Sequence, residues 1–252
     1  MHSSPLLATY DIRLVAVSVL IAVCASYAAL DLVERITLAG SNSRLGWLSG
    51  GAIAMGTGIW SMHFTGMLAY HLPVDVYYHI PTVIVSLLLA IVASLIALFV
   101  VCRPRISGLH VIAGSVLIAT AICGMHYTGM DAMRLPAMHH WDQSFVLLSI
   151  VIALVVALAA LGLTSLFRSG RRESALKGLC AVIMGFAICS MHYTAMVAVS
   201  FTRMPETPDL TNAISISTLA NTAIVAVTFV VLGSVFLFQR WFPAQEPARS
   251  EA

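Results

Sequence analysis

One heptapeptide occurs three times in this chain, as Ser61-Met62-His63-Phe64-Thr65-Gly66-Met67, Gly124-Met125-His126-Tyr127-Thr128-Gly129-Met130 and Ser190-Met191-His192-Tyr193-Thr194-Ala195-Met196. Its histidines are 63 and 66 residues apart. Each copy lies near the end of a long apolar segment, which is typical of an internal repeat built from helices. Packing alone rarely requires a histidine beside methionine three times over. We therefore interpret the heptapeptide as the centre of a repeat and as a candidate set of metal ligands.

The composition indicates a membrane protein. Hydrophobic residues make up 60% of the 252 residues and charged residues 10%, whereas soluble domains have about 25% charged residues. Seven apolar stretches reach the roughly 20 residues that a transmembrane helix requires. We place these spans at about 14–37, 47–70, 81–101, 109–132, 144–167, 178–201 and 214–238. The expected fold is an all-α protein with seven transmembrane helices in a lipid bilayer.

The distribution of Lys and Arg predicts how these spans are oriented. Ten of the thirteen basic residues lie in the connections 1–2, 3–4 and 5–6 or in the C-terminal tail, and only Arg13, Arg134 and Arg203 lie on the opposite side. By the positive-inside rule, the N-terminus is therefore expected outside and the C-terminus in the cytoplasm. The basic residues are the usual flanks of spans, so they give no support to nucleic-acid binding.

The repeat extends well beyond the heptapeptide. Each unit contains the motif helix that carries the heptapeptide, a short outer loop, a plain apolar helix and a basic inner connection, over about 46–108, 109–177 and 178–240. Because each unit has two spans, the units share one orientation and form parallel repeats about an axis near the membrane normal. One N-terminal helix precedes these three two-helix repeats and falls outside the pattern. We expect one seven-span domain over 1–240 and a short polar cytoplasmic tail over 241–252.

Small residues recur at equivalent places in the three units and predict close packing. Upstream of the heptapeptides they are Gly56 and Gly58, Ala119 and Ala121, and Gly185 and Ala187. In membranes, small residues allow helix backbones to approach closely. Within the heptapeptides, we interpret Gly66, Gly129 and Ala195 as packing residues that keep the helix surface thin.

Helix geometry places a histidine and a methionine on one face of each motif helix. The pairs are His63 with Met67, His126 with Met130, and His192 with Met196. Cys123 and Cys189 add a thiol to two of these faces, and Met62, Met125 and Met191 lie about 100° round the helix. If the three helices are neighbours, the imidazoles converge beside soft sulfur atoms, which suits copper best and zinc second. The alternative is that these histidines only hold helices together through hydrogen bonds.

With three Met-His-Tyr/Phe-Thr phrases on alternate helices, the chain resembles the MHYT domain, a bacterial integral-membrane sensor domain, over nearly its whole length. The resemblance implies seven spans in the bacterial inner membrane with the motifs near the outer face. It also implies sensing of oxygen, carbon monoxide or nitric oxide through copper held by His63, His126, His192 and the motif methionines. Family members often continue into enzymes that make or degrade cyclic di-GMP. The resemblance therefore implies either a separate cytoplasmic signalling protein of that kind as partner, or that this chain is a fragment of a longer protein. Phe64 and Ala195 depart mildly from the Tyr and Gly of the family pattern.

The predicted function is a membrane sensor, not an enzyme, that binds copper and responds to a diatomic gas or to redox state. Two alternatives stay open. A copper transport or uptake protein would also need His and Met on the outer side, but it requires a polar path through the inner half of the spans. A haem-binding membrane redox protein would use paired histidines. Hydrolytic or nucleophilic catalysis has no support, because no Ser-His-Asp set and no carboxylate pair is suggested by the sequence.

Overall fold

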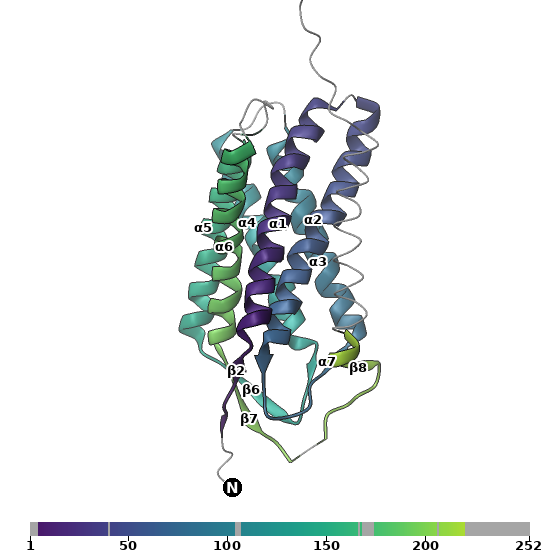
Figure 1. Cartoon of the computed structure of the whole chain (residues 1–252), viewed down its shortest axis with the longest axis vertical. Coiled ribbons are helices and arrows are strands. Elements are labelled where there is room, and N and C mark those ends of the chain that lie inside the picture. Colours follow the sequence, from purple (N-terminus) through teal and green to yellow (C-terminus); the bar gives the residue numbers. More distant parts are fainter. Residues whose placement is uncertain are drawn as a thin grey trace, which may run out of the picture.

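The computed structural model describes residues 5–39, 41–103, 107–165, 167, 174–205 and 207–219. Six long helices run side by side in an elongated bundle (Figure 1). They are α1 (Ile12–Leu38), α2 (Ser41–Ala69), α3 (Ile80–Val101), α4 (Gly108–Asp131), α5 (Gln143–Ser165) and α6 (Ser174–Val197). The three-residue helix α7 (Ile216–Thr218) follows. Most of the seventh predicted span, and the whole predicted tail, lie outside the described residues.

Five of the described helices are long and apolar enough to cross a membrane, namely α1, α3, α4, α5 and α6. Among these five helices, the largest shift from the predicted span is four residues, for the span predicted at 178–201 and observed as Ser174–Val197. Helix α2 is also long, at 29 residues, but Gly, Ser, Thr and Trp lower its hydropathy. The chain is therefore a mostly helical, multi-pass membrane protein, and the prediction of seven spans is confirmed for five of them.

The six helices form a closed ring in chain order. Each helix packs against the next one along the chain, and α6 packs against α1. The motif helices α2, α4 and α6 alternate with the plain helices α1, α3 and α5, and α2 also contacts both α4 and α6. We expected helix α1 to fall outside the repeat. In the ring it lies between the motif helices α6 and α2, just as α3 lies between α2 and α4 and α5 lies between α4 and α6.

Short antiparallel strands connect the helices at one end of the bundle, which we call the strand end (Figure 1, bottom). They are β1 (Pro5–Leu6), β2 (Thr9–Tyr10), β3 (Tyr70–His71), β4 (Tyr77–His79), β5 (Met133–Arg134), β6 (Ala137–Trp141), β7 (Val199–Arg203) and β8 (Ala213–Ser215). The strand before each plain helix pairs with the strand after the following motif helix: β2 with β3, β4 with β5, and β6 with β7. Strands β1 and β8 pair with β7 and β4. The longest pairing runs from Ala137 opposite Arg203 to Trp141 opposite Val199.

Three equivalent backbone hydrogen bonds show that the bundle has an internal threefold repeat. In each, the amide just before a plain helix donates to the carbonyl at the end of the next motif helix. The bonds are Asp11 to Ala69 at 2.9 Å, His79 to Ala132 at 2.8 Å, and Asp142 to Ala198 at 2.8 Å. The repeat of the structure is thus a hairpin of one plain and one motif helix. Each predicted unit instead begins with a motif helix and ends with the plain helix that follows it, one helix later in the same alternating pattern.

The predicted close packing of small residues is confirmed at the interfaces between motif and plain helices. A Cβ atom at Gly56 would lie 2.6 Å from the Cα atom of Ile91 on α3. At the equivalent Gly185, it would lie 2.8 Å from the backbone nitrogen of Val23 on α1. Real Cβ atoms do not approach backbone this closely, so only glycine allows these helix backbones their present separation.

Gly56→Leu is therefore expected to destabilise the bundle, because the new side chain forces α2 away from α3. Overpacking of this kind costs about 1–3 kcal/mol or more. Thermal unfolding of the detergent-solubilised protein measures the effect as a lower Tm. The matched control is Gly162→Leu on α5, where an added Cβ would meet no described residue within 4 Å. Equal Tm values for the two variants would contradict the packing argument.

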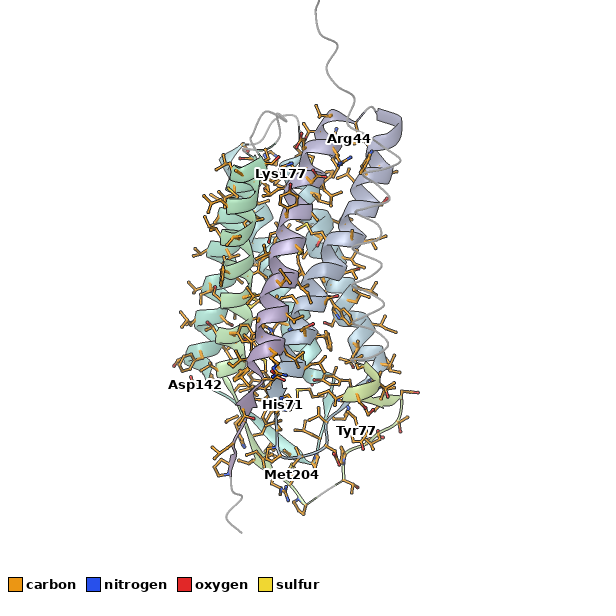
Figure 2. The ribbon with its side chains drawn as sticks, viewed as in Figure 1. Arg44, His71, Tyr77, Asp142, Lys177 and Met204 are labelled. Atoms are coloured by element: carbon orange, nitrogen blue, oxygen red, sulfur yellow. The ribbon has the colours of Figure 1, made fainter. Side chains whose placement is uncertain are left out.

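At the opposite end, which we call the basic end, an ion-pair cluster joins α1 to α6 near the labelled Lys177 (Figure 2). The Nζ atom of Lys177 lies 2.8 Å from a carboxylate oxygen of Glu34 and 3.3 Å from one of Asp31. Asp31 also accepts a hydrogen bond from Nε of Arg35 at 2.6 Å. Arg44 donates to the carbonyl of Cys102, which links α2 to the end of α3. These contacts join the basic ends of α1 and α6, and those of α2 and α3.

Candidate metal centre

The three motif histidines meet inside the ring, where α2, α4 and α6 come together. The Nδ1 atoms of His63 and His126 are 3.1 Å apart, those of His63 and His192 are 3.1 Å apart, and those of His126 and His192 are 3.3 Å apart. The imidazole rings face each other edge-on, with centroids 4.8–5.2 Å apart. All three residues are buried, with at most 1% of their surface exposed. The convergence predicted from the repeat is therefore observed.

The triangle of Nδ1 atoms is close to the size that a metal ion requires. The point equidistant from its corners lies about 1.8 Å from each nitrogen, given sides of 3.1–3.3 Å. Metal–imidazole bonds are about 2.0–2.1 Å for zinc. Widening each side by a few tenths of an ångström would place an ion in contact with all three nitrogens. The residues present thus fit a three-coordinate metal site.

No placement of protons on neutral imidazoles gives all three pairs of Nδ1 atoms a hydrogen bond. In a neutral imidazole, Nδ1 either carries a proton and donates or carries a lone pair and accepts. With three mutually adjacent atoms and two possible states, at least two neighbours must be alike. Every arrangement of neutral rings therefore contains at least one pair of facing lone pairs or at least one pair of facing N–H groups, and both are repulsive. A cation at the centre removes the conflict, because it accepts all three lone pairs together.

The glycine of the heptapeptide makes room for the imidazole of another motif helix. A Cβ atom at Gly66 would overlap Nε2 of His192, and one at Gly129 would overlap Nε2 of His63. The third equivalent position is Ala195, which is fully buried. Among the described residues, the Nε2 atoms of the three histidines have no hydrogen-bond partner. The imidazoles of His192 and His63 are thus positioned by packing against the backbone of a neighbouring motif helix, and their Nδ1 edges are turned to the triangle.

The six motif methionines predicted as ligands fall into different parts of the structure. Met67, Met130 and Met196, each one turn nearer the strand end than its histidine, belong to one buried cluster. Met125 shares that cluster, whereas Met62 and Met191 lie in two others. A shared cluster around one axis is the arrangement that would let thioethers face the triangle. Coordination by these methionines stays a prediction.

Two cysteines that we placed on the histidine faces pack elsewhere. Cys123 lies in a cluster with Met191, and Cys189 lies in a cluster with Met62. Within the described part of the chain, the only potential ligand atoms of His, Cys, Asp or Glu that gather here belong to the three histidines. The candidate site therefore has neutral nitrogen donors and carries no negative charge of its own from these residue types.

Three buried serines on the plain helices support the motif helices, and sequence reasoning missed them. Tyr127 and Tyr193, which follow motif histidines, form 2.7 Å hydrogen bonds with Ser149 on α5 and Ser18 on α1. In the first repeat the motif has Phe64, and the equivalent Ser86 donates instead to the carbonyl of Met125 at 2.9 Å. The serines are 68 and 63 residues apart. This spacing, close to the repeat period, is the signal that could have found them.

Tyr127→Phe is expected to lower stability by about 1 kcal/mol, because it removes one side-chain hydrogen bond. Ser149 keeps its bond to the carbonyl of Val146 at 2.7 Å, so no buried donor is left without a partner. Thermal unfolding in detergent measures the change. Tyr77→Phe is the matched control, since the hydroxyl of Tyr77, labelled at the strand end in Figure 2, makes no hydrogen bond with a described residue. A loss of stability as large in the control would show that the Tyr–Ser pair has no special role.

The strand end closes one side of the centre. Tyr78 on β4 is fully buried and packs edge-on against Phe64, with ring centroids 5.8 Å apart. Burial in these apolar surroundings raises the pKa of the Tyr78 hydroxyl well above its ordinary value. The tyrosine therefore stays neutral and adds no charge to the region between the histidines and the strand end.

On the opposite side of the centre, an apolar cavity of about 90 Å³ lies inside the ring. Its wall includes Ile59, Ile122 and Ile188. Each of these isoleucines lies four residues, about one helical turn, before a motif histidine. The histidine triangle is thus bordered by methionines and aromatic side chains toward the strand end and by a cavity toward the basic end.

Comparison with known proteins gives this architecture a family. A family model described as the bacterial signalling protein N-terminal repeat, MHYT, matches residues 56–114, 120–177 and 185–248. The chain is 43% identical over 197 residues to the bifunctional diguanylate cyclase/cyclic di-GMP phosphodiesterase MucR of Pseudomonas aeruginosa, a match that covers 78% of this chain and 29% of that protein. It is 35% identical over 203 residues to the cyclic di-GMP phosphodiesterase NbdA of the same organism, covering 79% and 26%. The signaling protein YkoW of Bacillus subtilis is 32% identical over 197 residues, covering 77% and 24%.

The chain spans about a quarter of the length of these relatives. No solved structure matches it. The three family matches together cover well over half of the chain, and each contains one of the three heptapeptides. The chain therefore belongs to the MHYT family of bacterial signalling-protein repeats.

Proposed function

We propose that this chain is the sensor part of a membrane signalling system and that its three motif histidines hold a copper ion, through which it senses a diatomic gas or redox state. The observation that carries the proposal is the buried triangle of Nδ1 atoms with sides of 3.1–3.3 Å. Such a triangle has no satisfactory arrangement of protons, and it fits a metal ion.

Charge favours monovalent copper over a divalent ion. Neutral imidazoles are the donors at this buried site, and within the described residues no carboxylate or thiol joins them. Burying an uncompensated charge is costly, and in the Born description the cost rises with the square of the charge. A Cu(I) ion would therefore pay about one quarter of the desolvation cost of Zn²⁺. Thioethers from Met67, Met130 and Met196 would add soft donors that further select Cu(I).

The chain's own residues position the site and exclude water. Copper(I), when bound, supplies an electron-rich ion that can bind oxygen, carbon monoxide or nitric oxide. His63, His126 and His192 would hold it, Gly66 and Gly129 would set the orientation of two imidazoles, and the aromatic side chains of the strand end would keep bulk water away.

The structure gives less support to the two alternatives. A copper transporter needs polar groups along an ion path, whereas the space beyond the triangle is lined by Ile59, Ile122 and Ile188. A haem needs room for a macrocycle between its axial ligands, whereas the imidazole nitrogens are 3.1–3.3 Å apart. We therefore favour sensing over transport or haem-based redox chemistry, and we assign the chain no catalytic step.

The basic end faces the cytoplasm of the bacterial inner membrane in this proposal, with the N-terminus outside, as the positive-inside rule predicts. Two of the relatives are named for making or degrading cyclic di-GMP. We propose that the state of the metal centre is passed through the helices to a cytoplasmic signalling protein of that kind.

The test is to purify the protein in detergent without added metal and to measure copper, zinc and iron by elemental mass spectrometry. Stoichiometric copper is the expected result. Titration of the Cu(I)-loaded protein with carbon monoxide, followed by the infrared C–O stretch, then tests gas binding. Zinc or no metal in the purified protein, together with failure to load Cu(I), would overturn the copper site. Copper without any gas complex would leave redox state as the sensed quantity.

A further inference from the structure

The cavity beside the histidines is built from the same repeat as the metal centre. Five helices contribute to its wall, from α2 to α6. The three equivalent isoleucines Ile59, Ile122 and Ile188 lie at the end nearest the histidines, one turn before each of them. Toward the basic end, alanines of α3 and α5, such as Ala93 and Ala157, leave the space open. A void at this place therefore follows from small side chains repeated around the ring.

The cavity offers water almost nothing to bond to. Among the described residues that line the cavity, only Ser94 and Thr164 carry hydroxyl groups. The Ser94 hydroxyl already donates to the carbonyl of Ala90 at 2.9 Å, and that of Thr164 donates to the carbonyl of Ala160 at 2.6 Å. A buried water needs two to four polar partners, and apolar cavities without them stay dry. The favoured occupant is thus an uncharged molecule that makes no hydrogen bonds.

The volume limits how large such a molecule can be. An engineered apolar cavity of about 150 Å³ binds benzene or xenon, and the present cavity of about 90 Å³ is smaller. It has room for a molecule of two or three heavy atoms. Met55, Met184 and Met191 also line it, and their polarisable sulfur atoms favour contact with a polarisable guest.

We propose that this cavity is a binding site for small apolar molecules of the size of dioxygen, which reach the histidine triangle from it. Such molecules dissolve in the hydrocarbon core of a membrane, and the cavity lies within the membrane-spanning part of the bundle. The isoleucine ring separates the guest from the imidazoles by one helical turn. The role of the cavity in supplying the sensor rests on the proposed copper site, whereas the binding of a guest does not.

Xenon is the probe for guest binding, because it is apolar, uncharged and detectable. Metal-free protein in detergent is titrated with xenon and followed by ¹²⁹Xe NMR. We expect saturable binding to the native protein and its loss in Ile122→Trp, whose larger side chain fills the cavity. Ile183→Trp is the matched control. Ile183 lies on α6, a motif helix like α4, and its side chain is 52% exposed and points away from the bundle. Ala157→Leu, on another wall, serves in place of Ile122→Trp if that variant does not fold.

Supply to the metal is tested with Cu(I)-loaded protein. The rate of carbon monoxide association should fall on the order of tenfold in the filled variant, with an unchanged copper content. An unchanged rate would overturn the supply role. Absence of saturable xenon binding to the native protein, or a lipid or detergent chain found in the cavity, would overturn the binding site itself. Xenon binding in a protein that takes up no copper would reject the proposed function and leave this site standing.

Discussion

His126→Ala is expected to reduce the copper content of the purified protein from stoichiometric to background. The variant leaves two imidazoles where the native centre has three, and it opens the triangle whose sides are 3.1–3.3 Å. Changing a residue that only supports a metal ligand already weakens affinity roughly 10–100-fold. Removing a ligand should therefore weaken Cu(I) affinity more than about 100-fold. Competition with a chromogenic Cu(I) chelator measures the affinity, and elemental mass spectrometry measures the content.

The matched control is His140→Ala. This histidine lies on β6, is exposed and is hydrogen-bonded to Thr202 at 2.9 Å, so its loss should leave copper unchanged. Circular dichroism of both variants checks that the helices are retained. Native copper affinity in a folded His126→Ala protein would mean that the imidazoles act only as packing residues.

Gly129→Ala should disturb the centre almost as strongly, although it adds a single methyl group. The new Cβ atom would overlap Nε2 of His63, so the imidazole must turn or the helices must separate. Either movement takes one Nδ1 atom out of the triangle. We expect a loss of stability of about 1–3 kcal/mol and a Cu(I) affinity at least tenfold lower, measured by thermal unfolding and by chelator competition.

Two substitutions on the motif helices serve as controls for this prediction. Gly124→Ala adds the same methyl group on α4, but there the nearest side-chain atom is 3.5 Å away, which is ordinary contact. Ala195→Gly removes the methyl group that the third repeat already has. Both variants should keep copper. If Gly124→Ala loses as much copper as Gly129→Ala, the effect comes from helix propensity and not from the contact with His63.

The helices and the convergence of the histidines could be predicted because both depend on long-range regularity in the sequence. Apolar runs of about 20 residues define spans, and three copies in one orientation bring His63, His126 and His192 to one depth. The strands could not be predicted in the same way. They have two to five residues each, too few to show alternation of apolar and polar side chains, and they form because the ends of adjacent helices lie close together.

The place of α1 in the ring could not be predicted from its sequence, and the reason is again physical. This helix carries no heptapeptide, so its sequence shows no copy of the motif. Its membership in the ring depends on contacts with α6 and α2, such as the approach of Val23 to Gly185 and the bond from Ser18 to Tyr193. A single serine or alanine at the right spacing is too weak a pattern to identify a repeat before the packing is known.

The threefold arrangement of hairpins has a consequence for the origin of the site. Each hairpin provides one imidazole and one small residue against which another hairpin's imidazole can pack. A polypeptide consisting of one such hairpin would therefore build the same centre by forming a homotrimer. Duplication and fusion of its gene would convert a site shared between subunits into a site within one chain. After fusion each copy is free to change alone, and Phe64 and Ala195 are differences of that kind, which a symmetric trimer could not have carried in one subunit only.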